Sequence, residues 1–208
     1  KRLDAAQTAR ALATMAEAVL GSVLRIAERD LIANHGTIEE RYGDSAGMSV
    51  IGYGSLGGIE LGFGSDLDLV FVYDGSLANL ESTGPKPLDG ARYYARLAQR
   101  FVHLLTMLTR SGRLYEIDIR LRPDGGKGLL VTSLEAYSAY QRERAWTWEH
   151  QALVRARVVA GDVALGRRFT EARAAALDAR AYGPELRRKI VEMRTRWRKE
   201  SDRSTATV

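Results

Sequence analysis

The chain has 208 residues, of which 45% are hydrophobic and 27% are charged, and it contains no cysteine. This composition excludes an intrinsically disordered protein, a disulfide-stabilised protein and a thiolate metal site. No apolar run approaches the roughly 20 residues of a membrane helix, and no signal peptide is recognisable, so we expect a cytoplasmic protein without a membrane partner.

The first expected element is a long amphipathic helix over residues 4–33. Its hydrophobic residues recur at steps of three and four, which is the spacing of one helix face. They are Leu12, Met15, Val19, Val23 and Ile26. We expect this face to be buried. A polar connector then leads to residues 48–54, which predict a first strand that ends at glycine.

The next stretch, GYGSLGGIELGFGSDLDLVFVYD (residues 52–74), places six glycines before two aspartates. It ends in an apolar segment, residues 67–73, which predicts a buried strand. Because side chains alternate along a strand, Asp66 and Asp68 point to one face. The opposite face carries Leu67, Leu69 and Phe71. Two adjacent carboxylates are costly without a cation between them, so the pair predicts a divalent metal ion, although aspartate at a strand start also caps turns.

Residues 74–90 are loop by composition, and Asp89 is placed to cap a helix that Gly112 ends. The apolar side of this helix is expected to carry Tyr93, Leu97, Phe101, Leu104 and Leu108. After a third strand and a short apolar segment, Thr132 and Glu135 form a T-x-x-E capping box that opens a helical second half.

The third strand is predicted over residues 113–123. Glu116, Asp118 and Arg120 share one of its faces, opposite a hydrophobic face. If this strand lies beside the first acidic one, Asp118 completes a three-carboxylate cluster that suits two Mg²⁺ ions. Glu116 is a rival for that position, and Asp118 could instead pair with Arg120 or Arg122.

The glycine-rich loop meets a second requirement of phosphate chemistry, because backbone N–H groups approach phosphate oxygens closely where no side chain intervenes. Gly54 and Ser55 are the favoured contacts, with Gly57 beside them. Arg120 and Arg122 are candidates either for phosphate or for structural ion pairs. The loop lacks the G-K-[ST] ending of a P-loop, and an acidic strand rather than a helix follows it, which argues against a Rossmann site.

The helical second half contains AWTWEHQALVRAR, which we interpret as one wall of a substrate groove. Its aromatic and imidazole side chains are expected in the core; they are Trp146, Trp148 and His150. Because Arg155 and Arg157 are two positions apart on a helix, only one of them is expected to face the groove.

A net charge of +5 would suit a nucleic-acid partner. Much of the excess lies in ELRRKIVEMRTRWRK, where hydrophobic residues fall at helical spacing and basic residues fill the other positions. We interpret this segment as the solvated face of a helix that begins at Pro184, and we expect no nucleic-acid partner. Because the sequence begins at Lys1 and ends in a polar tail, we expect it to be part of a longer protein.

A Gly-Ser pair, ten intervening residues and then Asp-hydrophobic-Asp-hydrophobic, with a later carboxylate in a strand, resembles the DNA polymerase β-like nucleotidyltransferase superfamily. The stretches GYGSLGGIELGFGSDLDLVFVYD, LYEIDIRLRPDGGKGLLVTS and AWTWEHQALVRARVVAGD resemble more closely the glutamine synthetase adenylyltransferase family. The last stretch is similar to the adenylylating rather than the adenylyl-removing half of these bifunctional enzymes. Ser55 stands where members of the family commonly have lysine.

The resemblance implies an α+β fold, with a mixed sheet, flanking helices and a helical second half. We divide the chain into a leading helix (1–35), a catalytic core (36–132) and a helical region (133–208). The resemblance also implies roles for the site residues. The catalytic residues and Mg²⁺ ligands would be Asp66, Asp68 and Asp118, and the nucleotide-binding residues Gly54, Ser55, Gly57, Arg120 and Arg122.

The activity implied by the resemblance is transfer of AMP from ATP to a tyrosine hydroxyl of glutamine synthetase, which regulates nitrogen assimilation. A PII signalling protein would act through the full-length enzyme. Three alternatives share parts of this pattern: the phosphorolytic, adenylyl-removing reaction, a nucleic-acid nucleotidyltransferase, and a non-catalytic regulatory module.

Overall fold

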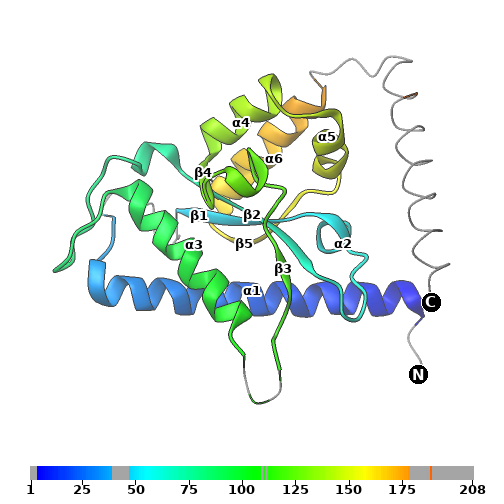
Figure 1. Cartoon of the computed structure of the whole chain (residues 1–208), viewed down its shortest axis with the longest axis horizontal. Coiled ribbons are helices and arrows are strands. Elements are labelled where there is room, and N and C mark those ends of the chain that lie inside the picture. The colour runs from blue at the N-terminus through cyan, green and yellow to red at the C-terminus, as the bar shows by residue number, and fades with distance from the viewer. Residues whose placement is uncertain (1–3, 39–46, 109, 111, 179–187, 189–208) are drawn as a thin grey trace. The chain divides into compact units, whose positions relative to one another are not determined.

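A computed structural model describes residues 4–38, 47–108, 110, 112–178 and 188 (Figure 1). The chain divides into two compact units, Lys1–Leu177 and Asp178–Val208, and the fold below belongs to the first. Along this unit, helices are interspersed with strands that together form a mixed sheet. This confirms the α+β prediction and is consistent with a polymerase β-like nucleotidyltransferase fold. The predicted basic helix that begins at Pro184 lies outside the described residues.

In the described residues, five strands form a mixed sheet, of which four follow the order β3-β2-β1-β5 and the fifth, β4, pairs with β2 beside this path. They are β1 (Met48–Gly52), β2 (Leu67–Tyr73), β3 (Ile117–Asp118), β4 (Val131–Ser133) and β5 (Arg157–Gly161). β1 pairs antiparallel with β2 and β5, whereas β3 and β4 pair parallel with the start and the end of β2. The first two strands therefore lie where the sequence predicts them.

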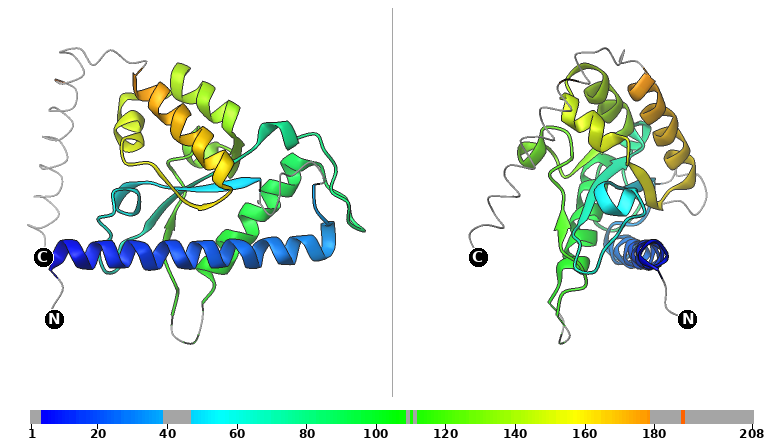
Figure 2. Two further views of the ribbon diagram at one scale, coloured as in Figure 1. Left: turned by 180° about the vertical axis from the view of Figure 1, so that it is seen from behind. Right: turned by 90° about the vertical axis from the view of Figure 1, so that its right-hand side faces the viewer.

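The described residues form six α-helices around this sheet. They are α1 (Ala5–His35), α2 (Gly54–Gly57), α3 (Gly90–Thr106), α4 (Leu134–Glu143), α5 (Thr147–Leu153) and α6 (Val163–Asp178), with short 3₁₀ helices at Gly75–Leu77 and Gly125–Lys127. α1 and α3 cover one face of the sheet, and α4 and α6 cover the other (Figures 1 and 2). No helix in the described part of the chain has the length and apolar character needed to cross a membrane.

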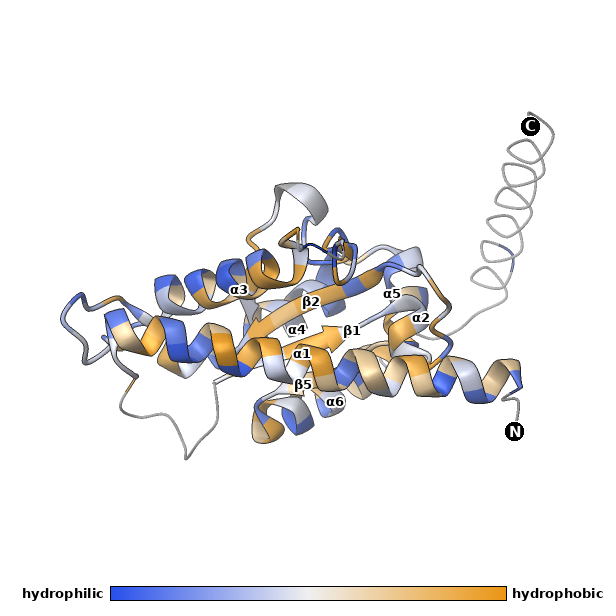
Figure 3. Cartoon of the chain, turned by 90° about the horizontal axis from the view of Figure 1, so that it is seen from below, coloured by the Kyte–Doolittle hydropathy of each residue, from blue (hydrophilic) through white to orange (hydrophobic). Residues whose placement is uncertain are grey.

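The residues of β2 alternate between two hydrophobic cores. Leu67, Leu69 and Phe71 belong to the core under α1 and α3, as predicted. Val70 and Val72 belong to the core under α4 and α6. Figure 3 shows the strongly hydrophobic β1 and β2 lying behind α1 and α3. Because side chains alternate, Asp68 is directed to the α4 and α6 side of the sheet.

The predicted buried face of α1 is wrong in part. Met15 is 62% exposed and Ile26 is 40% exposed. The residues that α1 buries are instead Ala13, Ala16, Leu20, Val23, Leu24, Ala27, Leu31 and His35. Alanines on the buried face let the helix backbone approach its neighbours closely, so the packed face is not the face with the largest side chains.

Two predicted helix boundaries also differ. α3 begins at its predicted cap, where the Asp89 side chain accepts a hydrogen bond from the Arg92 backbone, but it ends at Thr106, and Leu108 is 75% exposed. The cap of α4 is Ser133 rather than Thr132, since the Ser133 hydroxyl accepts from the Ala136 backbone at 3.1 Å. The N-cap is therefore displaced by one residue, and the predicted capping box is not formed, because the residue three positions after Ser133 is Ala136.

The predicted helical second half contains one strand. β5 pairs with β1 across an irregularity between Val50 and Ile51, so it completes the sheet from the far side. The third predicted strand is shorter than expected, because the chain turns after Asp118 and only two residues remain in β3. Of the two strands, β3 pairs with the acidic start of β2, whereas β5 joins the sheet through β1.

Candidate active site

The structure brings two of the three predicted aspartates side by side. Asp68 on β2 is the register partner of Asp118 on β3, and the two strands are parallel. Neighbours in register on parallel strands project from the same face of the sheet. Asp66 is exposed and lies immediately before β2. The carboxylates of all three residues thus gather at the start of β2.

The electrostatics of this cluster are uneven. Burial raises the pKa of Asp68, and the negative charges of Asp118 and Asp66 raise it further. The pKa of Asp118 is lowered, chiefly by its hydrogen bonds with the Arg120 side chain. The ionised form of Asp68 is therefore destabilised by its two carboxylate neighbours, whereas that of Asp118 is stabilised by Arg120. A cation near Asp68 would relieve this repulsion.

Arg120 supplies the positive charge beside Asp118. Its Nε lies 3.0 Å from Oδ1 and 2.9 Å from Oδ2 of Asp118, and its Nη2 also donates to Oδ2. The Arg120 backbone N–H donates to Oδ1 at 2.8 Å, which closes a turn directly after β3. The pair is asymmetric in exposure, because the Asp118 side chain is 18% exposed and that of Arg120 is 82% exposed.

Gly54 and Ser55 form the first turn of α2, between β1 and the aspartates. The Tyr53 backbone N–H donates to the Asp68 carbonyl at 2.9 Å, which fixes this turn to β2. Gly54 has a φ of +52°, and a Cβ at that position would lie 2.1 Å from Oδ2 of Asp68. The predicted phosphate turn and the predicted carboxylate are therefore in direct contact.

Gly57 has a packing reason to be glycine. A Cβ there would lie 2.1 Å from the carbonyl oxygen of Arg155 and 2.5 Å from that of Gly52. The close approach is to the segment before β5. Nucleotide binding by Gly57 stays a prediction.

Arg122 and Glu116 lie near the aspartates but have other partners. The Arg122 guanidinium donates to the carbonyl oxygens of Ile119, Gly126 and Gly128, so it braces the turn after β3. A nucleotide contact by Arg122 stays a prediction. Glu116 is paired with Arg113 at 2.8 Å, and Asp118 stands beside Asp68 instead.

The buried side chain of Tyr53, which precedes Gly54, was not singled out by the sequence. Its hydroxyl is hydrogen-bonded to that of Tyr137 on α4, and these side chains are 2% and 1% exposed. Burial raises the pKa of both phenols. On the same side of the sheet, the buried Glu149 accepts from the Tyr140 hydroxyl and the Trp146 backbone. In the sequence, only the position of Tyr53 between two glycines could have pointed to this buried tyrosine pair behind the Gly54 turn.

The segment AWTWEHQALVRAR differs from its prediction. α5 ends at Leu153, and Arg157 belongs to β5, so the two arginines do not share a helix. Arg157 donates to the carbonyl oxygens of Leu56 and Gly57 and to Glu17, whereas Arg155 pairs with Glu60.

The arginines and tryptophans therefore have other surroundings than predicted. Arg155 and Arg157 line a hollow of about 470 Å³ behind the glycine loop, and none of the three aspartates lines it. Trp146 and Trp148 are 70% and 45% exposed rather than packed in the core, whereas His150 is buried.

The donor chemistry at the start of β2 fits a hard divalent cation, because carboxylate oxygens are the ligands that Mg²⁺ prefers. In the arrangement of the described residues, however, no group of three or more acidic or histidine side chains is placed to hold a metal ion. Both oxygens of Asp118 accept hydrogen bonds from Arg120, so this carboxylate already has a cationic partner.

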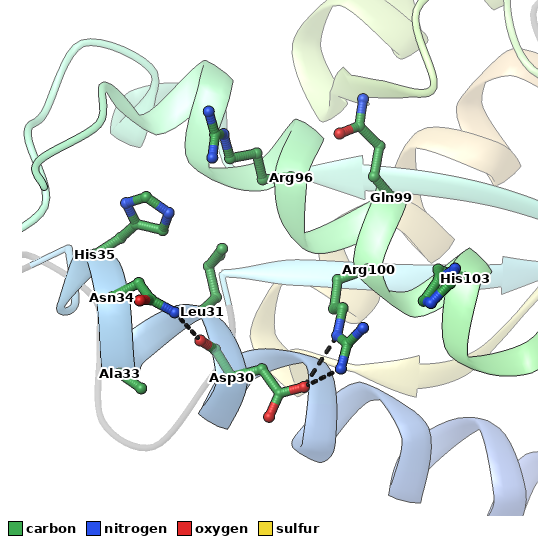
Figure 4. A pocket seen from close by; sticks show the side chains of 9 residues that line it. All are labelled: Asp30, Leu31, Ala33, Asn34, His35, Arg96, Gln99, Arg100 and His103. Atoms are coloured by element: carbon green, nitrogen blue, oxygen red, sulfur yellow. Dashed lines mark hydrogen bonds and ion pairs between the residues drawn. The ribbon is translucent and has the colours of Figure 1, made fainter.

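Another hollow lies away from the aspartates, between the C-terminal part of α1 and α3 (Figure 4). It has a volume of about 700 Å³ and is lined by Asp30, Leu31, Ala33, Asn34, His35, Arg96, Gln99, Arg100 and His103. Arg100 is paired with Asp30 at 2.6 Å. None of the predicted site residues lines it, so we keep the candidate site at the aspartates.

Comparison with known proteins gives one family. A family model described as glutamate-ammonia ligase adenylyltransferase matches residues 1–172. A bifunctional glutamine synthetase adenylyltransferase/adenylyl-removing enzyme from Xanthomonas axonopodis pv. citri is 52% identical, over 99% of this chain and 21% of that protein. Proteins of the same description from Stenotrophomonas maltophilia and Pseudomonas syringae pv. tomato are 53% and 50% identical, over 99% and 90% of this chain and 22% and 19% of their own lengths. The chain thus spans about one fifth of these relatives.

Proposed function

Because this chain belongs to the glutamate-ammonia ligase adenylyltransferase family, we propose that it carries a nucleotidyltransferase site that moves AMP from ATP to a tyrosine hydroxyl of glutamine synthetase. The names of its relatives state the transferred group and the protein acted upon. One observation carries the proposal to this site: Asp68 and Asp118 are neighbours in register, and Asp68 touches the Gly54 turn. Such a site would act in the cytoplasm and regulate nitrogen assimilation.

We assign Asp66, Asp68 and Asp118 as the ligands of two Mg²⁺ ions. When bound, Mg²⁺ neutralises triphosphate charge and polarises the α-phosphoryl group. The raised pKa of Asp68 supports the assignment, because its two carboxylate neighbours leave it in need of a cation. Asp118 joins the site once its hydrogen bonds with the Arg120 side chain are released.

The remaining chemistry is alignment and charge stabilisation. The tyrosine oxygen forms a bond to the α-phosphorus, the bond from that phosphorus to the β-phosphate oxygen breaks, and pyrophosphate leaves. The hydroxyl proton passes to Asp118. Backbone N–H groups of Gly54 and Ser55, in the first turn of α2, orient the triphosphate, and Arg120 contributes positive charge.

The direct test is mass spectrometry of glutamine synthetase after incubation with this chain, ATP and Mg²⁺. We expect the added mass of one AMP on a tyrosine, and its loss when Asp68→Asn replaces the wild type. Circular dichroism of the variant should match the wild type. If the double variant Asp66→Asn with Asp68→Asn transfers AMP at a normal rate, the assigned mechanism is wrong.

A second arm separates the two activities that the relatives' names contain. Adenylylated glutamine synthetase is incubated with the chain and inorganic phosphate, and ADP is measured. ADP without AMP transfer would assign the chain to the adenylyl-removing reaction. Control by a PII signalling protein stays a prediction for the full-length enzyme.

A further inference from the structure

Both carboxylate oxygens of Asp118 accept hydrogen bonds from Arg120. Oδ1 accepts from the Arg120 backbone N–H, the single Nε–H is shared between Oδ1 and Oδ2, and Nη2 donates to Oδ2. A carboxylate offers about four lone-pair sites, two on each oxygen. A metal ion at Asp118 therefore competes with the Arg120 side chain for the same two oxygens.

The Arg120 side chain can be released locally. It is 82% exposed, and it contacts a residue only two positions away, so its release does not require the chain to rearrange. The backbone N–H of Arg120 keeps one bond to Oδ1 when the side chain moves, so the turn after β3 is preserved.

The guanidinium of Arg120 also lies in the electrostatic field of the other two aspartates. Guanidinium groups bind phosphate oxygens in a bidentate manner, as they bind a carboxylate, so a triphosphate can take the place of Asp118 as the partner of Arg120. The nucleotide would thus supply Arg120 with a replacement for Asp118.

We infer that Arg120 couples metal binding to nucleotide binding: it occupies the lone pairs of Asp118 until a nucleoside triphosphate draws it away, and the metal ion then takes its place. This inference rests on the metal assignment in the proposed function. Arg120 is a positioning residue, acting on the metal through Asp118. The coupling is reciprocal, as linkage requires.

Two binding measurements test this without any turnover. The first is the affinity for Mn²⁺ alone, followed by electron paramagnetic resonance. Arg120→Ala should bind Mn²⁺ about fivefold more tightly than wild type, the order expected for removal of one exposed competing ion pair. Arg120→Gln, which keeps the length of the stem, guards against a folding defect and should change in the same direction.

The second is the affinity for α,β-methylene-ATP in the presence of EDTA, followed by calorimetry. Arg120→Ala should bind the analogue more weakly than wild type. Asp118→Asn should bind it at least as tightly as wild type, because it frees Arg120 and removes a negative charge, although it should lose Mn²⁺ affinity. The matched control is Arg92→Ala, since Arg92 is 78% exposed and pairs locally with Asp89; it should change neither affinity.

The outcomes separate this inference from the function it rests on. Equal Mn²⁺ affinity in wild type and both Arg120 variants overturns the coupling and leaves the metal site standing. Absence of Mn²⁺ binding in every protein, with no effect of Asp118→Asn, overturns the metal site and the coupling together. Tighter Mn²⁺ binding by the Arg120 variants, with no AMP transfer by wild type, supports the coupling and rejects the adenylylation.

Discussion

Gly54 and Asp68 are in contact across the start of the acidic strand: a Cβ on Gly54 would lie 2.1 Å from Oδ2 of Asp68. Gly54 also has a φ of +52°, a left-handed conformation that glycine adopts without strain. The turn that is proposed to bind phosphate therefore fixes where the Asp68 carboxylate can stand.

Gly54→Ala should displace Asp68 and reduce AMP transfer by about 100-fold, the cost of a misplacement of around 1 Å. The measurement is kcat/KM for glutamine synthetase adenylylation. Gly64→Ala is the control, because Gly64 has a φ of +73° but nothing within 4 Å of its Cβ position. Equal losses in both variants would attribute the effect to backbone strain rather than to Asp68.

Tyr53 and Tyr137 should behave as one buried unit. Tyr53→Phe leaves the Tyr137 hydroxyl without the partner it has here, which costs about 1–2 kcal/mol in the free energy of unfolding. The double replacement with phenylalanine should cost no more than either single one, because both polar groups are gone. Urea unfolding of the four proteins measures this, and strictly additive losses would contradict it.

Asp74 should make stability depend on acidity. Partial burial raises its pKa, but hydrogen bonds from Ser76 and the ion pair with Arg168 outweigh this and lower it from 3.8. A lowered pKa means that the charged form stabilises the fold above pH 3.8 and that this contribution is lost as pH falls through the folded value.

Asp74→Asn should therefore lower the free energy of unfolding by ~1 kcal/mol at neutral pH, and by progressively less as pH falls from about 5 to about 3. Urea unfolding at a series of pH values checks this. A difference between the two proteins that does not change with pH would show that the charge of Asp74 plays no part.

Arg157 should matter more than Arg155. Arg157 donates to two carbonyl oxygens at the end of α2 as well as to Glu17, whereas Arg155 has one exposed pair with Glu60. Arg157→Ala should lower stability by about 1–3 kcal/mol and raise the KM for ATP, and Arg155→Ala should change stability by less than ~0.5 kcal/mol. Thermal unfolding and steady-state kinetics of the two variants make the comparison. A larger loss in Arg155→Ala would show that the wrong arginine has been identified as the brace.

The acidic strand was predictable because its signals are local. Alternation within LDLVFVY defines two faces over seven residues, and the structure keeps them. The two segments that carry Asp68 and Asp118 both place acidic residues on one face of a strand. Their proximity was predicted on the condition that the two strands are neighbours, and they are. The ion pair that occupies Asp118 was considered as an alternative to metal binding, and the structure contains it.

The remaining differences arise from long-range packing. On α1, Met15 has the size of a core residue but is exposed, because closeness to the sheet and α3 favours alanine. β5 has few residues and becomes a strand only because β1 offers it an edge. Trp146 is exposed at the N-cap position, immediately before the first residue of α5. The exposure of Met15 and Trp146 and the strand conformation of β5 each depend on contacts between different helices and strands, which the local sequence pattern does not contain.

The position of β1 between β2 and β5 has a consequence for synthesis of the chain on the ribosome. One neighbour of β1 follows within about twenty residues, but the other is made more than a hundred residues later. Until Gly161 has emerged, one edge of β1 has unpaired backbone groups, which invite association with other chains. A nascent polypeptide truncated before β5 should therefore aggregate or bind a chaperone, and one extended beyond α6 should acquire resistance to protease.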